Sequence, residues 1–487
     1  MSFFVRFFPE IIIKSREVRN RHIAILRRSL RTQLKQLDPG VRIEGGWDHL
    51  SITTQLTASG DIDKVVQVLT HTPGLDRVMH IEKFPLTDLA GVIALSVEHN
   101  KHLIEGKSFA VRCKRSGKHA FTSMDVERGV GGALLENVPS ACVNLNDPEV
   151  LVRVDIHKDE VAIVKNVYAG LGGYPLGTQD AVLSLISGGF DSTVSSYQCI
   201  KRGLITHYCF FRLGGNEHEF AVKEVALYLW MKYGATHRVK FVTVPFEDVV
   251  DEIVGSVENS QMGVIFKRMM YRAASQVATK LKVDTLITGE SVAQVSSQTL
   301  ANLAIIDRVT DKLVLRPLAM LDKREIIDVA RAIGTEEFVK NVPEYCGVIS
   351  IKPTTRARLA KIEQQEALFN DDVLQAAVKN AEVQMIDRVM EGYTEQTKPV
   401  QEYDAENVDA VIIDIRHPDE EEKNPLEQSA FSQNIITIPF YELRKKFAEL
   451  EKEKQYVLYC DKGMMSRLHA SHLQEMGHAN VAVFRPS

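Results

Sequence analysis

Short apolar segments alternate with helical segments from residue 180 onward, and this alternation constrains the fold more than any other feature of the chain. The apolar segments are AVLSLI, ITHYCFF, HRVKFVTV and DTLITG. Such alternation is typical of a doubly wound parallel sheet, whose ligands bind beyond the carboxyl ends of the strands. The middle of the chain is therefore predicted to be a doubly wound α/β domain.

The remaining sequence predicts further domains on both sides of this one. At about 150 residues per domain, 487 residues correspond to roughly three domains. Strand-like and helical segments predict two α+β modules, over residues 1–60 and 61–167, before the doubly wound domain at 176–395. The Pro/Gln/Glu-rich stretch around 393–405 is interpreted as a linker, and renewed βα alternation predicts a small α/β domain over 406–487.

Charge and cysteine content exclude several classes of protein. The net charge is −5, but residues 1–40 carry nine Lys/Arg against three acids, so a local basic surface is expected there. The six cysteines are scattered and form no CxxC pair, so neither a disulfide framework nor a structural zinc site is expected. No apolar run is long enough for a membrane span, and charges interrupt the first residues, which predicts a cytoplasmic protein.

A glycine-rich loop follows the segment AVLSLI and precedes a predicted helix. It reads Ser187-Gly188-Gly189-Phe190-Asp191-Ser192. Glycines permit close backbone approach, and loop amides at a helix N-terminus attract an anion such as pyrophosphate. The loop lacks the Gly-Lys-Ser/Thr of the Walker A sequence. A plain glycine turn is the alternative interpretation of the Ser-Gly-Gly part alone.

Further candidate nucleotide contacts come from other strand ends and helix starts. They are Leu185 and Ile186 before the loop, Phe210 and Phe211 at the end of the second strand, then Lys267, Gly289, Gln298 and Lys323. A lone lysine is more often a solvated surface residue, and a phenylalanine at a strand end is more often core than an adenine platform.

A second reactive centre is predicted near the C-terminus. Cys460 follows the apolar segment YVLY and begins a loop that precedes a predicted helix, and Asp414 and Arg416 lie upstream in Asp-x-Arg order. A thiol surrounded by amide donors at a helix N-terminus is stabilised as thiolate or persulfide, so Cys460 is expected to be acidic and nucleophilic. The alternative is a buried apolar cysteine.

These features resemble known families over essentially the whole chain. The SGGFDS loop resembles the PP-loop of ATP pyrophosphatases, and the Cys460 loop with Asp414-x-Arg416 resembles the rhodanese active site, although Ser466 precedes Arg467 where rhodaneses usually have Gly-x-Arg-Ser. The TPGL and FAVRCKRSGKHAFTS…RGVGG segments resemble a THUMP domain. The order of parts is similar to tRNA 4-thiouridine synthases, which implies ferredoxin-like, THUMP, PP-loop and rhodanese domains over the four ranges predicted above.

The resemblance implies an activity, with partners and residue roles. The PP-loop site is expected to use ATP and Mg²⁺ to adenylate O4 of a tRNA uridine, with Asp191 supporting the metal or the phosphates. Cys460 would take sulfur from a cysteine desulfurase as a persulfide, and Cys346, in NVPEYCGVIS, would resolve it as a Cys346–Cys460 disulfide. The rhodanese part would also transfer sulfur to a sulfur-carrier protein, for synthesis of the thiazole of thiamine.

Two other classes of function stay open at this point. A tRNA-binding enzyme that uses the same loop to attach something other than sulfur would need neither Cys460 nor Cys346. A non-catalytic sulfur carrier would need the Cys460 loop but not Asp191.

Overall fold

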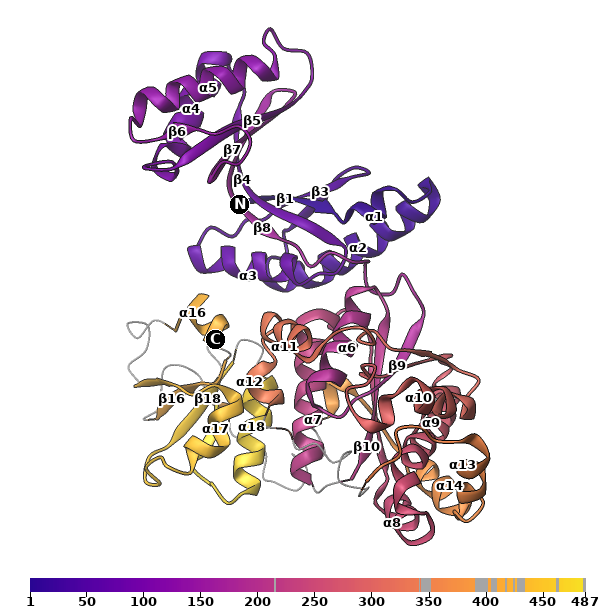
Figure 1. Ribbon diagram of the computed structural model, residues 1–487. Helices are drawn as coiled ribbons and strands as arrows, with labels where there is room; N and C mark the ends of the chain where they lie inside the picture. The colour runs from indigo at the N-terminus through magenta and orange to yellow at the C-terminus, as the bar shows by residue number, and fades with distance from the viewer. Residues whose placement is uncertain are drawn as a thin grey trace. The chain divides into compact units, whose positions relative to one another are not determined.

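The computed structural model describes residues 1–213, 216–340, 342, 352–389, 402–403, 410–416, 418–423, 425–426, 434–460 and 464–484. The chain divides into two compact units, Met1–Pro175 and Leu176–Ser487, and each is described by itself (Figure 1).

The first unit is built on one eight-stranded sheet with strand order β2-β3-β1-β4-β8-β7-β5-β6. In β1, Phe3, Val5 and Phe7 are buried while the alternate side chains face outward, which is the period-two pattern of a strand covered on one face. The elements are β1 (Ser2–Phe7), α1 (Pro9–Ile12), α2 (Arg16–Leu37), β2 (Arg42–Glu44), β3 (His49–Thr53), α3 (Ser59–Thr70), β4 (Leu75–Pro85), α4 (Leu89–Asn100), η1 (Lys101–Leu103), β5 (Ser108–Ser116), α5 (Ser123–Asn137), β6 (Cys142–Val143), β7 (Val150–His157) and β8 (Glu160–Ala169).

Helix α2 covers this sheet with an apolar stripe and exposes a basic face. Its buried residues include Ile23, Leu26 and Leu30, spaced three and four residues apart as a helix stripe requires. The helix ends at Asp38, whose carboxylate accepts hydrogen bonds from the amides of Gly40 and Gln55. The exposed face carries five cations, Arg16, Arg21, Arg28, Arg31 and Lys35.

The core around β1 continues past residue 60. Val65 and Leu69 of α3 and Leu75 of β4 pack in the same cluster as Phe3 and Leu26. Strand β1 and helix α2 therefore share one core with α3 and β4. A separate cluster lies between α4, α5 and the strands β5 and β7, and Phe109 and Val126 are fully buried in it.

A six-stranded sheet of order β13-β12-β9-β10-β11-β14 forms the centre of the second unit. Its strands are parallel except β14, which pairs antiparallel with β11 at the edge. The elements of this region are β9 (Ala181–Leu185), α6 (Phe190–Lys201), β10 (Ile205–Arg212), α7 (Asn216–Leu229), η2 (Trp230–Gly234), β11 (Lys240–Pro245), α8 (Glu247–Ser256), η3 (Asn259–Gln261), α9 (Met262–Leu281), β12 (Thr285–Ile287), η4 (Ser296–Gln298), α10 (Leu300–Ile306), η5 (Asp307–Val309), β13 (Leu313–Leu315), α11 (Lys323–Ala332), α12 (Glu336–Val339), α13 (Leu359–Glu366), α14 (Asp371–Lys379), β14 (Glu382–Met385) and η6 (Ile386–Arg388).

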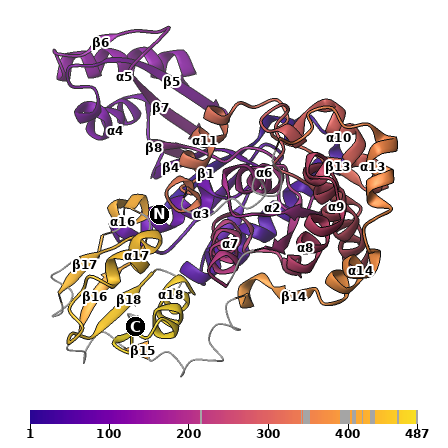
Figure 2. The same ribbon diagram turned by 60° about the horizontal axis from the view of Figure 1, so that its bottom comes forward.

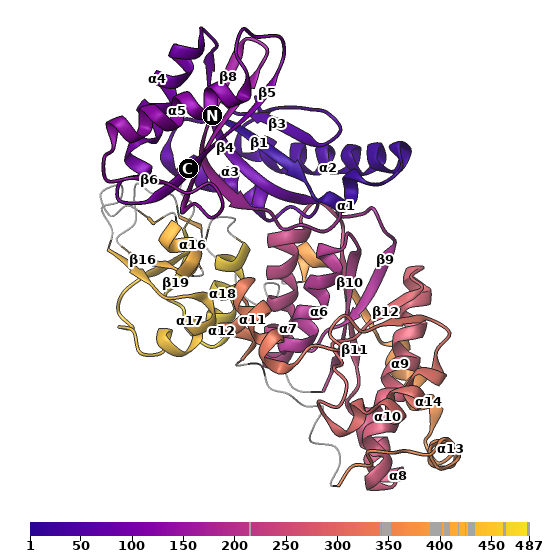
Figure 3. The ribbon, with the colours of Figure 1, turned by 45° about the horizontal axis from the view of Figure 1, so that its top comes forward.

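Helices cover both faces of this sheet, which explains why its strands are apolar throughout. In β10, Cys209 and Phe211 pack into the cluster that contains α8, α9 and α14, whereas Tyr208 and Phe210 pack into the cluster that contains α7. Figure 3 shows α6 and α7 on one side of β9 and β10, and α9 and α14 on the other. The predicted doubly wound sheet is confirmed, and the antiparallel strand β14 extends it at one edge.

The C-terminal region is a smaller five-stranded parallel sheet of order β15-β19-β18-β16-β17 (Figure 2). Its elements are β15 (Glu402–Tyr403), β16 (Val411–Asp414), α16 (Pro418–Lys423), β17 (Ile435–Thr437), α17 (Phe440–Phe447), β18 (Tyr456–Tyr459), α18 (Met464–Glu475) and β19 (Val481–Phe484). Strand β15 lies within the predicted linker, so the end of that stretch belongs to the sheet; most of 393–405 lies outside the described residues.

Side chains of the two parallel sheets share one hydrophobic cluster in the second unit. Phe440 of α17 packs against Tyr228 and Phe338, which lie on α7 and α12. On α18, His469 Nε2 lies 2.9 Å from the carboxylate oxygen Oε1 of Glu224 on α7, and both side chains are buried. Helix α7 therefore contacts both the six-stranded sheet and the C-terminal region.

Candidate functional site

The Ser-Gly-Gly loop forms the turn between β9 and α6. Gly188 has φ +81°, a left-handed conformation that favours glycine, and Gly189 is the N-cap residue of α6. Ser192 Oγ accepts a hydrogen bond from the amide of Ser187 (3.1 Å) and donates to the carbonyl of Gly189 (3.3 Å). The loop is thus closed on itself by Ser192, at the position where a helix N-terminus favours an anion.

Asp191, in the first turn of α6, is held by two side chains from elsewhere in the chain. Its Oδ1 accepts from Lys323 Nζ at 2.8 Å, and its Oδ2 accepts from Gln294 Nε2 at 2.7 Å. Lys323 Nζ also lies 5.4 Å from the ring centroid of Phe190, within the range of a cation–π contact. The sequence predicts both Asp191 and Lys323 as site residues, and the structure brings them into direct contact.

Gly289 follows β12 and lies against the first turn of α6. A Cβ atom at this position would meet the carbonyl carbon of Asp191 at 2.5 Å and the amide nitrogen of Ser192 at 2.7 Å. Only glycine fits here, because the obstructing atoms are backbone. Gln298, on η4, is buried, and its Oε1 accepts from the amide of Ser291 at 3.3 Å.

A cavity of about 250 Å³ lies at the carboxyl ends of β9, β10 and β12. Phe210 and Phe211, both buried, line it, and so does Lys267 from α9. The other predicted residues that line it are Leu185, Ile186, Ser187, Asp191, Ser192, Gly289 and Gln298. Gly188 and Gly189 form the adjoining loop, and Lys323 reaches the cavity through its ion pair with Asp191.

The structure adds three polar residues that the sequence analysis does not single out. His218, on α7, lies edge-on to Phe210 with ring centroids 5.1 Å apart, and burial lowers the pKa of its imidazole. Glu290 and Tyr271 lie at the base of the same cavity and are hydrogen-bonded to each other. For Glu290 the only signal in the sequence is its position directly after the strand-end glycine, Gly289.

Cys460 directly follows β18, and α18 begins four residues later, at Met464. Its thiol is buried, and Sγ accepts a hydrogen bond from the amide of Ser466, at 3.3 Å, in the first turn of α18. The Ser466 hydroxyl is 3.4 Å from the same sulfur. The sulfur therefore has donors of the kind that stabilise a thiolate, while residues 461–463 lie outside the described part of the chain.

The Asp-x-Arg pair supports the strand next to Cys460. Arg416 donates to both carboxylate oxygens of Asp414, at 2.6–3.1 Å, and both side chains are almost fully buried. The guanidinium of Arg416 lies 5.0 Å from the ring centroid of Tyr459, the residue before Cys460. The pair thus links the end of β16 to the end of β18.

The other described cysteines lack such surroundings. Burial raises the pKa of the Cys113 thiol to about 11 and that of Cys199 to about 12, and Cys209 is fully buried, so none of the three favours a thiolate. Cys142 is exposed on β6. Cys346 lies outside the described residues.

The cavity fits a nucleotide better than it fits a resident metal ion. A backbone cradle at Ser187–Gly189, a lysine and two aromatic rings supply donors for phosphate and apolar surface for a base. Within the described residues, no group of three or more His, Cys, Asp or Glu side chains could hold a metal ion. Of the two carboxylates that line the cavity, Asp191 is paired with Lys323 and Glu290 with Lys267 and Arg316.

Three parts of the chain match models of known families. Residues 177–370 match the family described as "Thiamine biosynthesis protein (ThiI)", residues 93–164 match the THUMP domain, and residues 399–485 match the rhodanese-like domain. Relatives named tRNA sulfurtransferase, from Azotobacter vinelandii and Pseudomonas putida, are 49% and 48% identical, and each alignment covers 100% of both chains.

Two solved structures share the fold. A 4-thiouridine synthetase, solved as an RNA complex with bound ATP, is 24% identical with a TM-score of 0.66, covering 79% of this chain and 99% of that one. PH1313 from Pyrococcus horikoshii Ot3 is 16% identical with a TM-score of 0.52, covering 69% of this chain and 100% of that one.

The fold and the two centres define an ATP-using enzyme that carries a rhodanese-like sulfur-transfer domain. Given relatives at 48% and 49% identity over their full length, the chain belongs to the tRNA sulfurtransferase family. It is an enzyme that uses ATP to place sulfur on tRNA, as the sequence predicts. In the part of the chain that the structure describes, no helix is long and apolar enough to cross a membrane.

Replacing Gly289 with alanine tests the close approach of backbone at the cavity. Because the new methyl group would meet the backbone of Asp191 and Ser192, we expect Gly289→Ala to displace the first turn of α6 and to weaken ATP binding at least about tenfold. Calorimetric titration with ATP measures this. Gly255→Ala on α8, where a Cβ meets no atom within 4 Å, is the matched control and should bind ATP normally. Equal affinities for both variants would contradict the argument.

Proposed function

We propose that the cavity at the carboxyl edge of the six-stranded sheet adenylates O4 of a tRNA uridine. O4 attacks the α-phosphorus of ATP, pyrophosphate leaves, and C4 becomes electrophilic with AMP as its later leaving group. The loop Ser187–Gly189 and Lys267 would bind the phosphates, and Phe210 and Phe211 would contact the adenine. Asp191 would support the phosphates together with Lys323, its ion-pair partner.

Sulfur delivery would proceed through Cys460. A cysteine desulfurase transfers a sulfur atom to the thiolate, forming a persulfide. In one route the terminal sulfur attacks C4 and displaces AMP, and Cys346 then attacks Sγ of Cys460, releasing thiouridine and forming the Cys346–Cys460 disulfide. In the other route Cys346 attacks first, and the released sulfide displaces AMP. In both routes a cellular thiol reductant restores the two thiols.

One observation carries this proposal: the nucleotide cavity and the thiol of Cys460 belong to the same compact unit and share a hydrophobic core. Ile186 and Phe210 from the cavity pack in the same cluster as Cys460. Val342 also belongs to this cluster, and a Cβ atom on Gly188 would lie 3.0 Å from it.

Mg²⁺ would be bound chiefly by the phosphates of ATP, because such sites usually use one or two carboxylates and substrate oxygens. When bound, it would neutralise phosphate charge. Asp191 is the side chain that we expect to support it, since its carboxylate lines the cavity at the loop. The four domain ranges, the desulfurase partner and a cytoplasmic location also stay predictions.

The first unit offers a basic surface that suits the tRNA partner. The exposed face of α2 carries five cations, spaced along 22 residues. On the sheet, the strand register places Arg6 opposite both His49 and Arg77, so three basic side chains lie side by side on neighbouring strands. The Lys and Arg side chains at these positions would neutralise backbone phosphates, which dominate the affinity of proteins for nucleic acids.

Replacing Cys460 separates sulfur transfer from other uses of the cavity. With tRNA, ATP, cysteine and a desulfurase, we expect Cys460→Ser to lower thiouridine formation at least about 100-fold, since no persulfide can form on an alcohol. A single-turnover burst of pyrophosphate should remain. The near-ultraviolet absorbance of thiouridine is the readout, and omission of ATP should abolish it in the wild type. Cys142→Ser, at an exposed cysteine, is the matched control. Unchanged product in Cys460→Ser would favour the rival class that attaches something other than sulfur.

Removing charge from α2 tests the RNA surface. We expect Arg21→Gln, Arg28→Gln and Arg31→Gln together to weaken tRNA binding and to reduce the slope of log K against log salt by about 2, because each phosphate contact contributes about 0.7–0.9. Filter binding from low to moderate salt measures it. Lys282→Gln, Lys379→Gln and Lys452→Gln, three exposed positions in the second unit, form the control. A slope unchanged from that control would place the RNA elsewhere.

We further propose that Cys460 supplies sulfur to a carrier protein for thiamine synthesis without use of the ATP cavity; the name of the matched family supports this. Asp191→Ala removes the partner of Lys323 and Gln294 and should lower tRNA thiolation at least about 100-fold, while sulfur transfer from Cys460 to a carrier protein stays within about twofold. Asp180→Ala, at an exposed aspartate before β9, should leave both activities intact. Normal thiolation in Asp191→Ala would support the rival class of non-catalytic sulfur carrier.

A further inference from the structure

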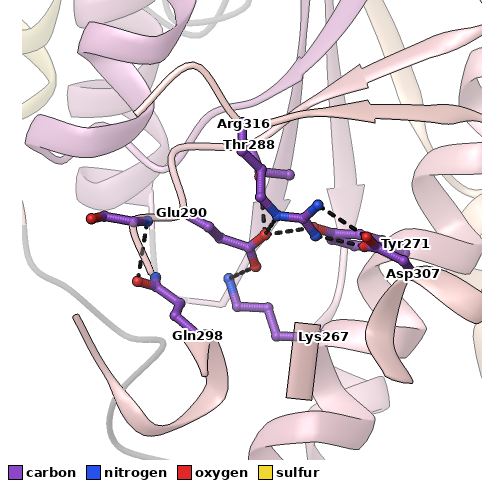
Figure 4. A network of polar contacts seen from close by, with 8 residues as sticks. Lys267, Tyr271, Thr288, Glu290, Gln298, Asp307 and Arg316 are labelled. Atoms are coloured by element: carbon purple, nitrogen blue, oxygen red, sulfur yellow. Dashed lines mark hydrogen bonds and ion pairs between the residues drawn. The ribbon is translucent and has the colours of Figure 1, made fainter. Parts of the chain in front are cut away.

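Four charged side chains gather at the base of the nucleotide cavity, and Figure 4 shows how they face one another. Lys267 comes from α9 and Glu290 from the segment after β12. Arg316 follows β13, and Asp307 begins η5. Two cations and two anions balance, and the side chain of Glu290 is only 3% exposed. At this burial, each charge needs a specific partner.

Arg316 is neutralised mainly by Asp307. Its Nη1 and Nη2 donate to the two carboxylate oxygens of Asp307 at 3.0 and 2.5 Å, which is a bidentate pair. The remaining Nε donates to Glu290 Oε2 at 2.9 Å. Glu290 is therefore not the principal counterion of Arg316, and its charge is largely left for another cation.

That second cation is Lys267. Tyr271 and Thr288 also donate to Oε2 of Glu290, at 2.7 and 3.0 Å, so three donors converge on one oxygen. The other oxygen, Oε1, is buried and makes no hydrogen bond with any described residue, and Lys267 Nζ lies 3.7 Å from it. The fixed Oε2 thus aims Oε1 at the ammonium group that lines the cavity (Figure 4).

We propose that Glu290 is a positioning residue for Lys267: it keeps the ammonium group protonated and directed into the cavity, so that a fixed positive charge meets the phosphates of ATP. The inference rests on the proposed function, because it takes ATP as the ligand of this cavity. The alternative interpretation is that Glu290 only anchors Arg316 and Tyr271.

Without Glu290, Lys267 would be a partly buried lysine near another cation, Arg316, and both conditions lower the pKa of an amine. The other groups that face it keep their charge between pH 7 and 9.5. Burial acts to lower the pKa of Arg316, but its hydrogen bonds to Asp307 raise it above the ordinary value, so Arg316 stays protonated. Burial raises the pKa of Tyr271 well above its ordinary value. A loss of ATP affinity at high pH that appears in Glu290→Gln but not in the wild type would therefore report Lys267, because Lys323 is the same in both proteins.

The test measures the dissociation constant of a non-hydrolysable ATP analogue by calorimetry at pH 7 and pH 9.5. Wild type should change less than about twofold between the two values, whereas Glu290→Gln should weaken about tenfold or more at the higher pH. Lys267→Met should bind about tenfold more weakly at both, since a hydrogen bond to a charged group is lost. In the Lys267→Met background, Glu290→Gln should add less than about twofold.

Asp307→Asn is the matched control, because it disturbs the pair with Arg316 but leaves Glu290 and Lys267 in place. Its pH profile should be as flat as that of the wild type. A flat profile for Glu290→Gln, or a full effect of this change in the Lys267→Met background, would overturn the positioning role and leave the anchoring one. Normal binding by Lys267→Met would also overturn it, whereas failure of the wild type to bind the analogue would instead contradict the proposed function.

Should Glu290→Gln not fold, as judged by its thermal unfolding, Glu290→Asp keeps the negative charge but withdraws it by one methylene group. We then expect the affinity for the ATP analogue to fall less at pH 9.5, by about threefold. A flat profile in Glu290→Asp would count against the proposal.

Discussion

The contact between Gly289 and the first turn of α6 is the constraint on which the nucleotide cavity depends. Two backbone segments from neighbouring strand ends approach so closely that no side chain fits between them. This contact fixes the loop after β9 relative to the segment after β12. Asp191 and Glu290, one on each segment, then face the same space, although they are 99 positions apart in the sequence. The charge pairs around them follow from that approach.

Helix α7 connects the nucleotide cavity of the second unit with the region that carries Cys460. Its first turn places His218 at the cavity, and its later turns place Glu224 and Tyr228 against α18 and α17. The six-stranded sheet and the sheet that carries Cys460 thus lie on one continuous core. On the proposed route Cys460 takes sulfur from a donor outside the chain, so its buried thiol would have to become accessible during each cycle.

The sequence predicts the parts of the site that depend on local order along the chain. The turn after AVLSLI, the glycine after DTLIT and the thiol after YVLY all fall at strand ends, and strand ends of a parallel sheet meet at one edge. It does not predict the pairing of Glu290 with Lys267 or of Arg316 with Asp307, because these partners come from separate elements and no short spacing links them. The sequence does not predict strand β14 either, because its partner strand β11 lies far away in the sequence.

The aromatic residues that join the two parallel sheets have a consequence for how such proteins can be shortened. Phe220, Tyr228 and Phe338 are covered by Phe440 and His469 of the C-terminal region. A chain that stopped before that region would leave these rings exposed to water, as an apolar patch that favours aggregation. Removal of the C-terminal region would therefore call for polar replacements on α7 and α12 at the same time.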